Sequence, residues 1–175
     1  MTKRMKKLTI FCLLLSVTLA AKAQFSSGSG SPTDPYIITD AAQLDQVRNH
    51  LSAHFRLEED INLAEYINTN YSSNGWLPIG DNGNEFTGSF HGGGHTISGL
   101  KIDRSSTENI GLFGYLDGAE IDSLGIVDCN ITGTNYVGGL VGYNDFFATI
   151  KNCYVSGNVT ANDAIVGGLA GINNK

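Results

Sequence analysis

The sequence predicts a mostly β protein, in which an N-terminal cap with one helix precedes a parallel β-helix, a solenoid of short strands that coil one pass above the next. The phrase Gly-Leu-x-Gly predicts the coil because it occurs three times, with its leucine at Leu112, Leu140 and Leu169, 28 and then 29 residues apart. A repeat of this length cannot bury its own apolar face, so neighbouring repeats must stack and cover it. Between the phrases, short apolar runs alternate with Gly, Asn and Asp, which is typical of strands and turns.

The glycine phrase supplies the positions that we expect to hold the repeat together. Its leucines should form one interior column, with passes about 4.8 Å apart. Its glycines should allow positive φ at corners, or let one backbone lie close to the next. These structural positions are Gly111, Leu112, Gly114, Gly139, Leu140, Gly142, Gly168, Leu169 and Gly171.

Two other phrases keep the same order along the chain. An apolar-x-x-apolar-x-apolar phrase occupies residues 97–102, 121–126 and 150–155, and the Asn-apolar-Thr phrase that begins at Asn130 returns 28 residues later. Leucine-rich repeats have similar periods but need a longer leucine-rich consensus, and propeller blades are longer, at about 40 residues. We therefore predict that residues 85–175 are β-helix repeats.

The first 23 residues predict a secretory signal peptide. Basic residues at 3–7 precede an apolar run at 8–21, and Ala21-Lys22-Ala23 is a small-x-small cleavage site. The run is shorter than the ~20 apolar residues that span a bilayer. We therefore expect cleavage near Ala23/Gln24 and a secreted or cell-surface protein that is not integral to the membrane.

Export would leave a strongly acidic chain. Five of the 11 basic residues precede the expected cleavage site and none of the 17 acidic residues does, so six bases and 17 acids remain, a formal net charge of −11. This charge argues against nucleic acid and against anionic membranes as partners, because both repel an acidic surface.

The residues before the repeats are expected to form a leader and a cap. Residues 24–33 are rich in Ser and Gly and predict a flexible leader. Residues 34–84 should form the cap, with one helix at about 40–54 that begins at Asp40, because a solenoid needs its open end covered. No capping segment follows the last glycine phrase. We expect the chain to be truncated from a longer array, the alternative being that its last strand edge pairs with a partner.

Two stretches of the chain resemble the GLUG repeat, VGGLVGYN at residues 137–144 and IKNCYVSG at 150–157. That repeat occurs in bacterial surface and secreted proteins, including non-catalytic regions of some immunoglobulin-A-cleaving peptidases. The resemblance covers about residues 34–175 and implies a right-handed β-helix with an adhesin-like, extracellular role. His91 departs from the pattern, which has Asp before the glycines. The zinc-binding motif His-Glu-x-x-His does not occur in the sequence. Segments similar to those that precede such arrays are residues 34–38, 76–80 and 86–97.

Two histidine pairs could suggest metal binding. His91 and His95 flank a glycine run, and His50 and His54 lie four residues apart on the expected helix. Neither pair has a third ligand at a fixed spacing, so a solenoid corner and exposed helix positions explain them. Residues 81–85 lack the ligand alternation of a calcium loop and predict a tight turn. No metal and no cofactor are expected.

Five aspartates are the candidates for catalysis. Paired carboxylates about 5–9 Å apart hydrolyse glycosides, and β-helix enzymes that act on polysaccharides are known. Most of these aspartates lie beside Gly or Asn, where Asp serves turns, so we predict that the protein is not an enzyme. The five are Asp117, Asp122, Asp128, Asp145 and Asp163.

Cys129 and Cys153 remain after cleavage, and an exported chain permits a disulfide between them. They are 24 residues apart against a period near 28, so they do not share a column. Cys153 instead falls in an inward apolar column, where a free thiol packs as a small hydrophobe. The sequence leaves both oxidation states open.

Tyrosines are the best candidates for binding. Tyr115, Tyr136, Tyr143 and Tyr154, with Tyr36 in the cap, could form an aromatic strip that contacts a host or self glycan or protein at the cell surface. We predict a non-enzymatic, adhesin-like or scaffold module that uses its β-helix as spacer and binding face. The alternatives are a polysaccharide-processing β-helix enzyme and a non-catalytic fragment of a larger secreted peptidase.

Overall fold

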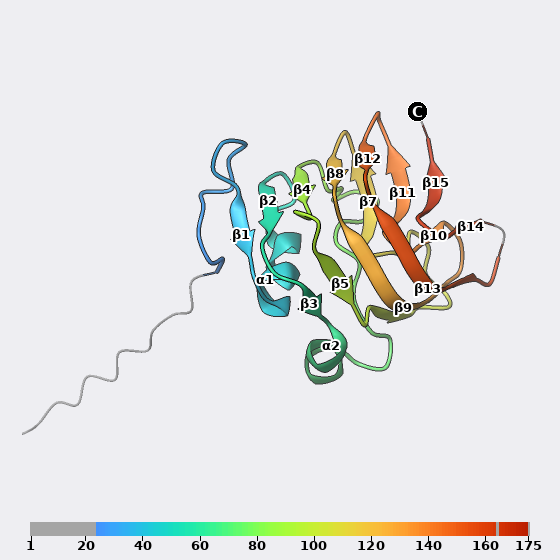
Figure 1. Cartoon of the computed structure of the whole chain (residues 1–175). Coiled ribbons are helices and arrows are strands. Elements are labelled where there is room, and N and C mark those ends of the chain that lie inside the picture. The colour runs from blue at the N-terminus through green and yellow to red at the C-terminus, as the bar shows by residue number, and fades with distance from the viewer. Residues whose placement is uncertain (1–23, 164, 175) are drawn as a thin grey trace, which may run out of the picture.

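The structure, a computed structural model, describes residues 24–163 and 165–174 (Figure 1). The expected signal peptide, residues 1–23, lies outside the described residues. The helices are α1 (Ala41–Gln46), the 3-10 helix η1 (Val47–Asn49) and α2 (Ala64–Asn70). The strands are β1 (Tyr36–Ile38), β2 (His54–Leu57), β3 (Ile61–Asn62), β4 (Ser89–His91), β5 (Thr96–Ser98), β6 (Lys101–Asp103), β7 (Phe113–Asp117), β8 (Glu120–Asp122), β9 (Gly125–Gly133), β10 (Val137–Gly138), β11 (Val141–Asp145), β12 (Thr149–Lys151), β13 (Tyr154–Ala161), β14 (Val166–Gly167) and β15 (Ala170–Asn173).

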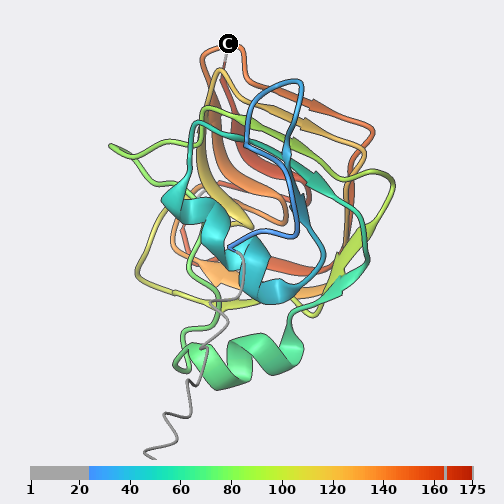
Figure 2. The ribbon, with the colours of Figure 1, turned by 90° about the vertical axis from the view of Figure 1, so that its left-hand side faces the viewer.

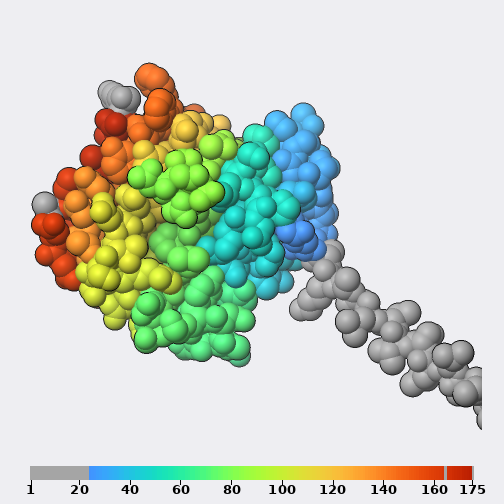
Figure 3. Space-filling model, turned by 180° about the vertical axis from the view of Figure 1, so that it is seen from behind, coloured from blue at the N-terminus to red at the C-terminus, as the bar shows by residue number. Residues whose placement is uncertain are grey.

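The prediction of a mostly β chain with parallel strands is confirmed. One sheet has the order β1-β2-β4-β8-β12, a second β3-β5-β9-β13 with β6 also on β9, a third β7-β11-β15, and β10 pairs with β14. Seen from the N-terminal end, the chain curls around a shared interior with α1 lying across the opening (Figure 2). From behind, successive stretches of chain form neighbouring bands from blue to red (Figure 3).

The sheet register places successive repeats side by side. Val141 pairs with Phe113 on one side and with Ala170 on the other. The preceding leucines therefore lie in adjacent passes, and the backbone N–H of Leu140 donates to the carbonyl of Leu169 at 3.0 Å. Leu112 and Leu140 are fully buried, whereas Leu169 is only partly buried.

Aromatic side chains fill the interior near the cap. The rings of Phe86 and Phe113 have centroids 5.0 Å apart, and Phe55 lies 6.3 Å from Phe90. All four are fully buried, as is Trp76, the single tryptophan of the chain. Large aromatic rings bury much apolar surface each, so this group anchors the first passes to the cap.

Residues 24–33, predicted to be a flexible leader, are instead packed on the fold. Phe25 is buried and stacks on Tyr36 with ring centroids 4.3 Å apart. The backbone N–H of Ser26 donates to Ile37 at 3.0 Å, and that of His54 donates to the carbonyl of Gly30 at 2.9 Å. The Ser/Gly composition was misleading because one aromatic residue and backbone pairing with β1 are enough to seat the segment.

The predicted helix at about 40–54 is shorter in the structure. Asp40 begins it as expected, its carboxylate accepting from the N–H of Gln43 at 2.8 Å. The helix ends by Asn49, and His54 already belongs to β2. Phe55 has the spacing of the helix's apolar face, but it is buried from a strand because β2 must pair with both β1 and β4. The polar stretch at 64–75, expected to be a loop, contains α2.

Candidate binding surface

Three tyrosines meet on the outer side of the β7-β11-β15 sheet. Tyr115 and Tyr143 are register partners on β7 and β11, so their rings stack at 4.7 Å with planes 5° apart. The ring of Tyr136 meets Tyr143 edge-on, with centroids 5.4 Å apart and planes at 79°. We call Tyr115, Tyr136 and Tyr143 the tyrosine cluster; all three are partly exposed.

Asp145 holds the tyrosine cluster in place. The hydroxyl of Tyr115 donates to Oδ2 of Asp145 at 2.8 Å, while the Phe146 N–H and the Asn174 side chain donate to Oδ1 at 2.9 and 3.0 Å. Burial and the Asp145 bond raise the pKa of Tyr115, and the Tyr115 bond lowers the pKa of Asp145. The phenol is therefore protonated and the carboxylate ionised at neutral pH, which fixes the orientation of the ring.

Phe146 and Phe147, which sequence reasoning missed, follow Asp145 directly and are the most exposed aromatic residues of the described part. Their side chains are 64% and 81% exposed, and both residues have positive φ, 47° and 59°. Left-handed backbone is strained for a bulky residue, so the loop displays two apolar rings at a backbone cost. The doublet Phe-Phe between two strands is the sequence signal that could have indicated an exposed aromatic tip.

The structure separates Tyr154 and Tyr36 from the tyrosine cluster. Tyr154 lies on β13, in a different sheet, and is 54% exposed. Its ring covers Gly125, where an added Cβ would lie 2.6 Å from the Tyr154 ring. Tyr36 packs in the cap on Phe25. Three of the four tyrosines proposed for binding are therefore together, and the expected single strip is not formed.

The five candidate aspartates do not form one line. Asp117 and Asp145 are register neighbours on β7 and β11. Asp122 instead lies on β8, where it accepts from the Asn152 side chain at 3.0 Å. Asp128 has positive φ, 53°, within β9, and Asp163 lies beyond β13. Because Asp145 already accepts three hydrogen bonds, the Asp117–Asp145 pair lacks a free carboxylate of the kind that acid–base catalysis requires.

The histidines each have a separate partner. His91 lies 3.4 Å from Asp122, and His95 lies 3.4 Å from Asp60. His54 contacts the Ser89 hydroxyl at 2.7 Å, and His50 packs edge-on against Phe25 in the cap. Within residues 24–163 and 165–174, no group of three or more His, Cys, Asp or Glu side chains is placed to hold a metal ion.

Residues 81–85 form a turn. The N–H of Asp81 donates to Asn84 at 3.0 Å, and the N–H of Gly83 donates to the Glu85 carboxylate at 2.8 Å. Cys129 and Cys153 are free thiols in the structure. Burial raises the pKa of both thiols, which makes them weak nucleophiles.

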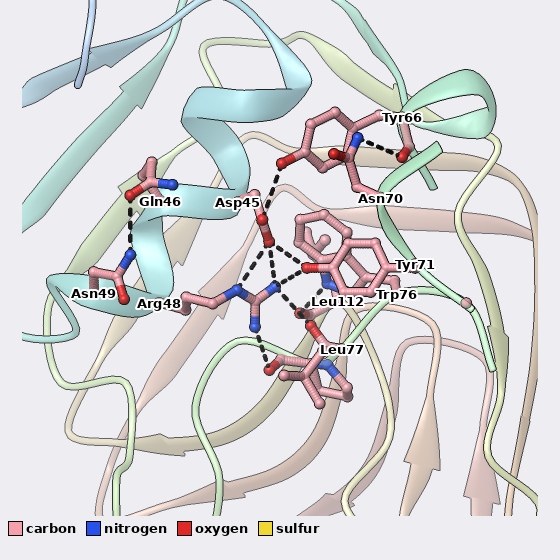
Figure 4. Close-up of polar contacts among 12 residues, drawn as sticks. Asp45, Gln46, Arg48, Asn49, Tyr66, Asn70, Tyr71, Trp76, Leu77 and Leu112 are labelled. Atoms are coloured by element: carbon pink, nitrogen blue, oxygen red, sulfur yellow. Dashed lines mark hydrogen bonds and ion pairs between the residues drawn. The ribbon is translucent and has the colours of Figure 1, made fainter. Parts of the chain in front are cut away.

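A polar cluster in the cap was also missed by sequence reasoning (Figure 4). Asp45 accepts from Arg48 at 2.7 Å, from Tyr66 at 3.0 Å and from Tyr71. The Arg48 guanidinium lies 5.0 Å from the centre of the Trp76 ring and donates to the carbonyls of Leu77 and Pro78. The Asp45–Arg48 spacing could have indicated the ion pair, but the approach of both tyrosines from α2 and its end is a tertiary contact.

A cavity of about 480 Å³ opens beside this polar cluster, between η1, the turn at 77–84 and residues 104–110. Its walls mix Leu51 and Ile110 with Arg104, Asp81 and Glu108. Arg104 donates to the carbonyls of Gly75 and Trp76. The two carboxylates offset its charge, so the cavity carries no clear preference for an anion or a cation.

Comparison with known proteins agrees with the repeat. Residues 133–160 match the family model described as the GLUG motif, which confirms the resemblance inferred from the sequence. The chain is 38% identical over 153 residues to Halomucin of Haloquadratum walsbyi, covering 83% of this chain and 2% of that protein. It is 42% identical over 109 residues to a "Putative Gly-rich membrane protein" of Evansella cellulosilytica, covering 61% of this chain and 12% of that protein.

The chain therefore spans a small part of the length of these two relatives. A crystal structure described as a "putative immunoglobulin A1 protease" from Bacteroides ovatus is similar with a TM-score of 0.49 and 18% identity, over 87% of this chain and 65% of that one. In the described part of this chain, the helices are all too short or too polar to cross a bilayer.

Proposed function

We propose that the chain is a non-enzymatic module of an exported surface protein, coiled as a right-handed parallel β-helix that serves as spacer and presents an aromatic binding face. The parallel register of β7, β11 and β15 and the buried interior support the coil. Passes held by backbone hydrogen bonds give a stiff rod, in which each repeat contacts its neighbours. The GLUG match and the relative named as a membrane protein support a role at the cell surface.

The observation that carries the binding proposal is the parallel stack of Tyr115 on Tyr143. Stacking holds the two rings in one orientation, so a ligand pays little side-chain entropy on binding them. Phe146 and Phe147 add exposed apolar surface beyond Asp145, and exposed aromatic surface of this kind marks interaction sites. The ligand that we propose is a neutral glycan, because the apolar face of a sugar ring packs on an aromatic ring and an acidic chain does not repel it.

A glycan panel screened against the mature protein tests this proposal. Binding should be detected by ligand-observed NMR and should weaken at least about tenfold, roughly 1.4 kcal/mol, in Tyr143→Ala and in Phe147→Ser. Tyr154→Ala is the matched control, because that tyrosine lies on another sheet, and it should bind as the parent does. Equal loss in all three variants, or no binding of any glycan, would contradict the proposal.

The same incubation distinguishes the enzymatic alternative. Product analysis should show intact glycans after long exposure to the protein. Shortened glycans that disappear with Asp117→Asn or Asp145→Asn would instead establish a polysaccharide-processing enzyme.

A further inference from the structure

The last pass of the chain exposes residues whose equivalents are buried one pass earlier. Register pairs relate each residue of the earlier pass to one of the last pass: Ile121 to Ile150, Ile126 to Val155, Ile131 to Val159, Val137 to Val166 and Val141 to Ala170. The earlier member of each pair is fully buried, whereas the later members are partly exposed and Val166 is 49% exposed. We call the surface of the later members the terminal face.

The strands of the terminal face also have one unpaired edge. In the described structure, β12, β13, β14 and β15 each end their sheet (Figure 1). At the opposite end of the first sheet, β1 is followed by an antiparallel bridge between Ser27 and Ile37 and covered by Phe25. The fold therefore closes its N-terminal end and leaves a row of backbone donors and acceptors open at the terminal face.

A polar position inside the coil continues to the same face. Leu116, Asn144 and Asn173 are register neighbours, and the buried Asn144 amide donates to Oδ1 of Asn173 at 2.6 Å and to the Ala148 carbonyl at 3.0 Å. Among the described residues, the Asn173 amide nitrogen has no recorded acceptor. An occupant of the terminal face with an acceptor in this column would continue the ladder, because buried amide groups need partners.

Glycine positions differ between the two passes in the same way. An added Cβ at Gly139 would lie 2.3 Å from Val155 and 2.7 Å from the Gly168 carbonyl, because the last pass covers it. At Gly168, the equivalent position, an added Cβ would meet nothing within 4 Å. A further pass would be expected to fill this space as the last pass fills the space at Gly139.

We propose that the terminal face is a docking surface for one more pass of the same 28–29-residue repeat, bound in parallel register. Within the chain, the surface formed by β8, β9, β10 and β11 already binds such a pass, so the terminal face continues an interface that the fold uses. The occupant should carry an apolar residue over Leu169, a small residue over Gly168 and a hydrogen-bond acceptor over Asn173. The proposal depends on the stacked coil and not on ligand binding, so a failed glycan screen leaves it standing.

An extended protein tests the docking surface. A copy of residues 146–174 placed directly after Asn174, in place of Lys175, continues the register because Asn144 pairs with Asn173. The expected results are a higher midpoint of thermal unfolding and amide exchange slowed at least about tenfold in β14 and β15, since paired strand edges open less often. The matched control has the same copy with its equivalent of Leu169 replaced by Asp, and should show neither effect.

Gly168→Ala provides a second readout. It should be nearly neutral in the parent chain and clearly destabilising in the extended chain, where the docked pass would leave no room for a methyl group. The proposal is overturned if the copy and its Asp control behave alike, or if Gly168→Ala has the same effect in both backgrounds. It is also overturned if the parent chain is a stable dimer by light scattering that Val166→Glu dissociates, because the occupant would then be a second copy.

Discussion

Gly139 and Gly168 occupy equivalent positions in successive passes, joined by a hydrogen bond from the N–H of Gly139 to the carbonyl of Gly168 at 3.0 Å, yet a side chain fits at only one of them. Gly139→Ala should destabilise the protein, because the new methyl group would collide with Val155 and with backbone, and overpacking of this kind costs about 1–3 kcal/mol. Gly168→Ala is the matched control and should change the free energy of unfolding by less than about 0.5 kcal/mol. Urea denaturation followed by Trp76 fluorescence measures both, and equal losses would contradict the stacking described here.

Leu140 and Leu169 form a second matched pair, with identical side chains and different burial. Leu140→Ala should cost about 3 kcal/mol, because it leaves a cavity in a fully buried site. Leu169→Ala should cost less than half as much, since its side chain is only partly covered. Chemical denaturation of both variants tests this order, which would be wrong if the Leu169 variant were the less stable.

Arg48→Lys should destabilise the cap although it keeps the positive charge. Lysine cannot donate at once to Asp45 and to the carbonyls of Leu77 and Pro78, as the planar guanidinium does. The loss of these hydrogen bonds should cost about 2 kcal/mol, and the change above the Trp76 ring should shift its emission. Arg56→Lys is the control, because its ion pair with Glu58 is exposed and should contribute little. A neutral Arg48→Lys variant would show that the polar cluster does not stabilise the cap.

Stability should fall between about pH 10 and pH 12 as tyrosines ionise. Burial and the bond to Asp45 raise the pKa of Tyr66 to about 12, so its phenol ionises in the unfolded chain at a lower pH than in the folded one. The stabilisation is therefore complete below pH 10 and is lost as the pH rises through 12. Tyr66→Phe should make the loss shallower, as measured by urea midpoints from pH 8 to 12. An unchanged slope would indicate that Tyr66 has an ordinary pKa.

At acidic pH the opposite sign applies to Asp145. Its lowered pKa means that the carboxylate stabilises the fold above its unfolded value near 4, and that this contribution disappears as the pH falls through the folded value. Asp145→Asn should remove that part of the acid dependence and should lower the pKa of Tyr115, because a neutral amide favours the phenol less. Ultraviolet titration of the phenols measures the second effect, with Asp163→Asn as an exposed control. An identical phenol titration in both variants would contradict the Tyr115–Asp145 bond.

The success and failure of sequence reasoning have separate physical causes in this chain. The interval between Leu112 and Leu140 predicted adjacent passes because strand polarity and glycine spacing are local, periodic properties. The helix was predicted too long because Phe55 fits a helical face and a strand equally well, and only pairing of β2 on both sides decides between them. The tyrosine strip was only partly predicted because equal spacing in sequence does not say which side of a corner Tyr154 takes.

By itself, the sequence determined the repeat period, the inward and outward alternation, and the positions of the glycines, since each of these follows from the conformational preferences of residues near one another. Only the tertiary structure decided that Phe25 closes the first end, that Asp45 gathers Arg48 and two tyrosines, and that Tyr115 and Tyr143 stack. These contacts join residues 21 to 30 positions or more apart, where the angle at each corner sets which side chains meet, and that angle depends on the packing of the whole interior.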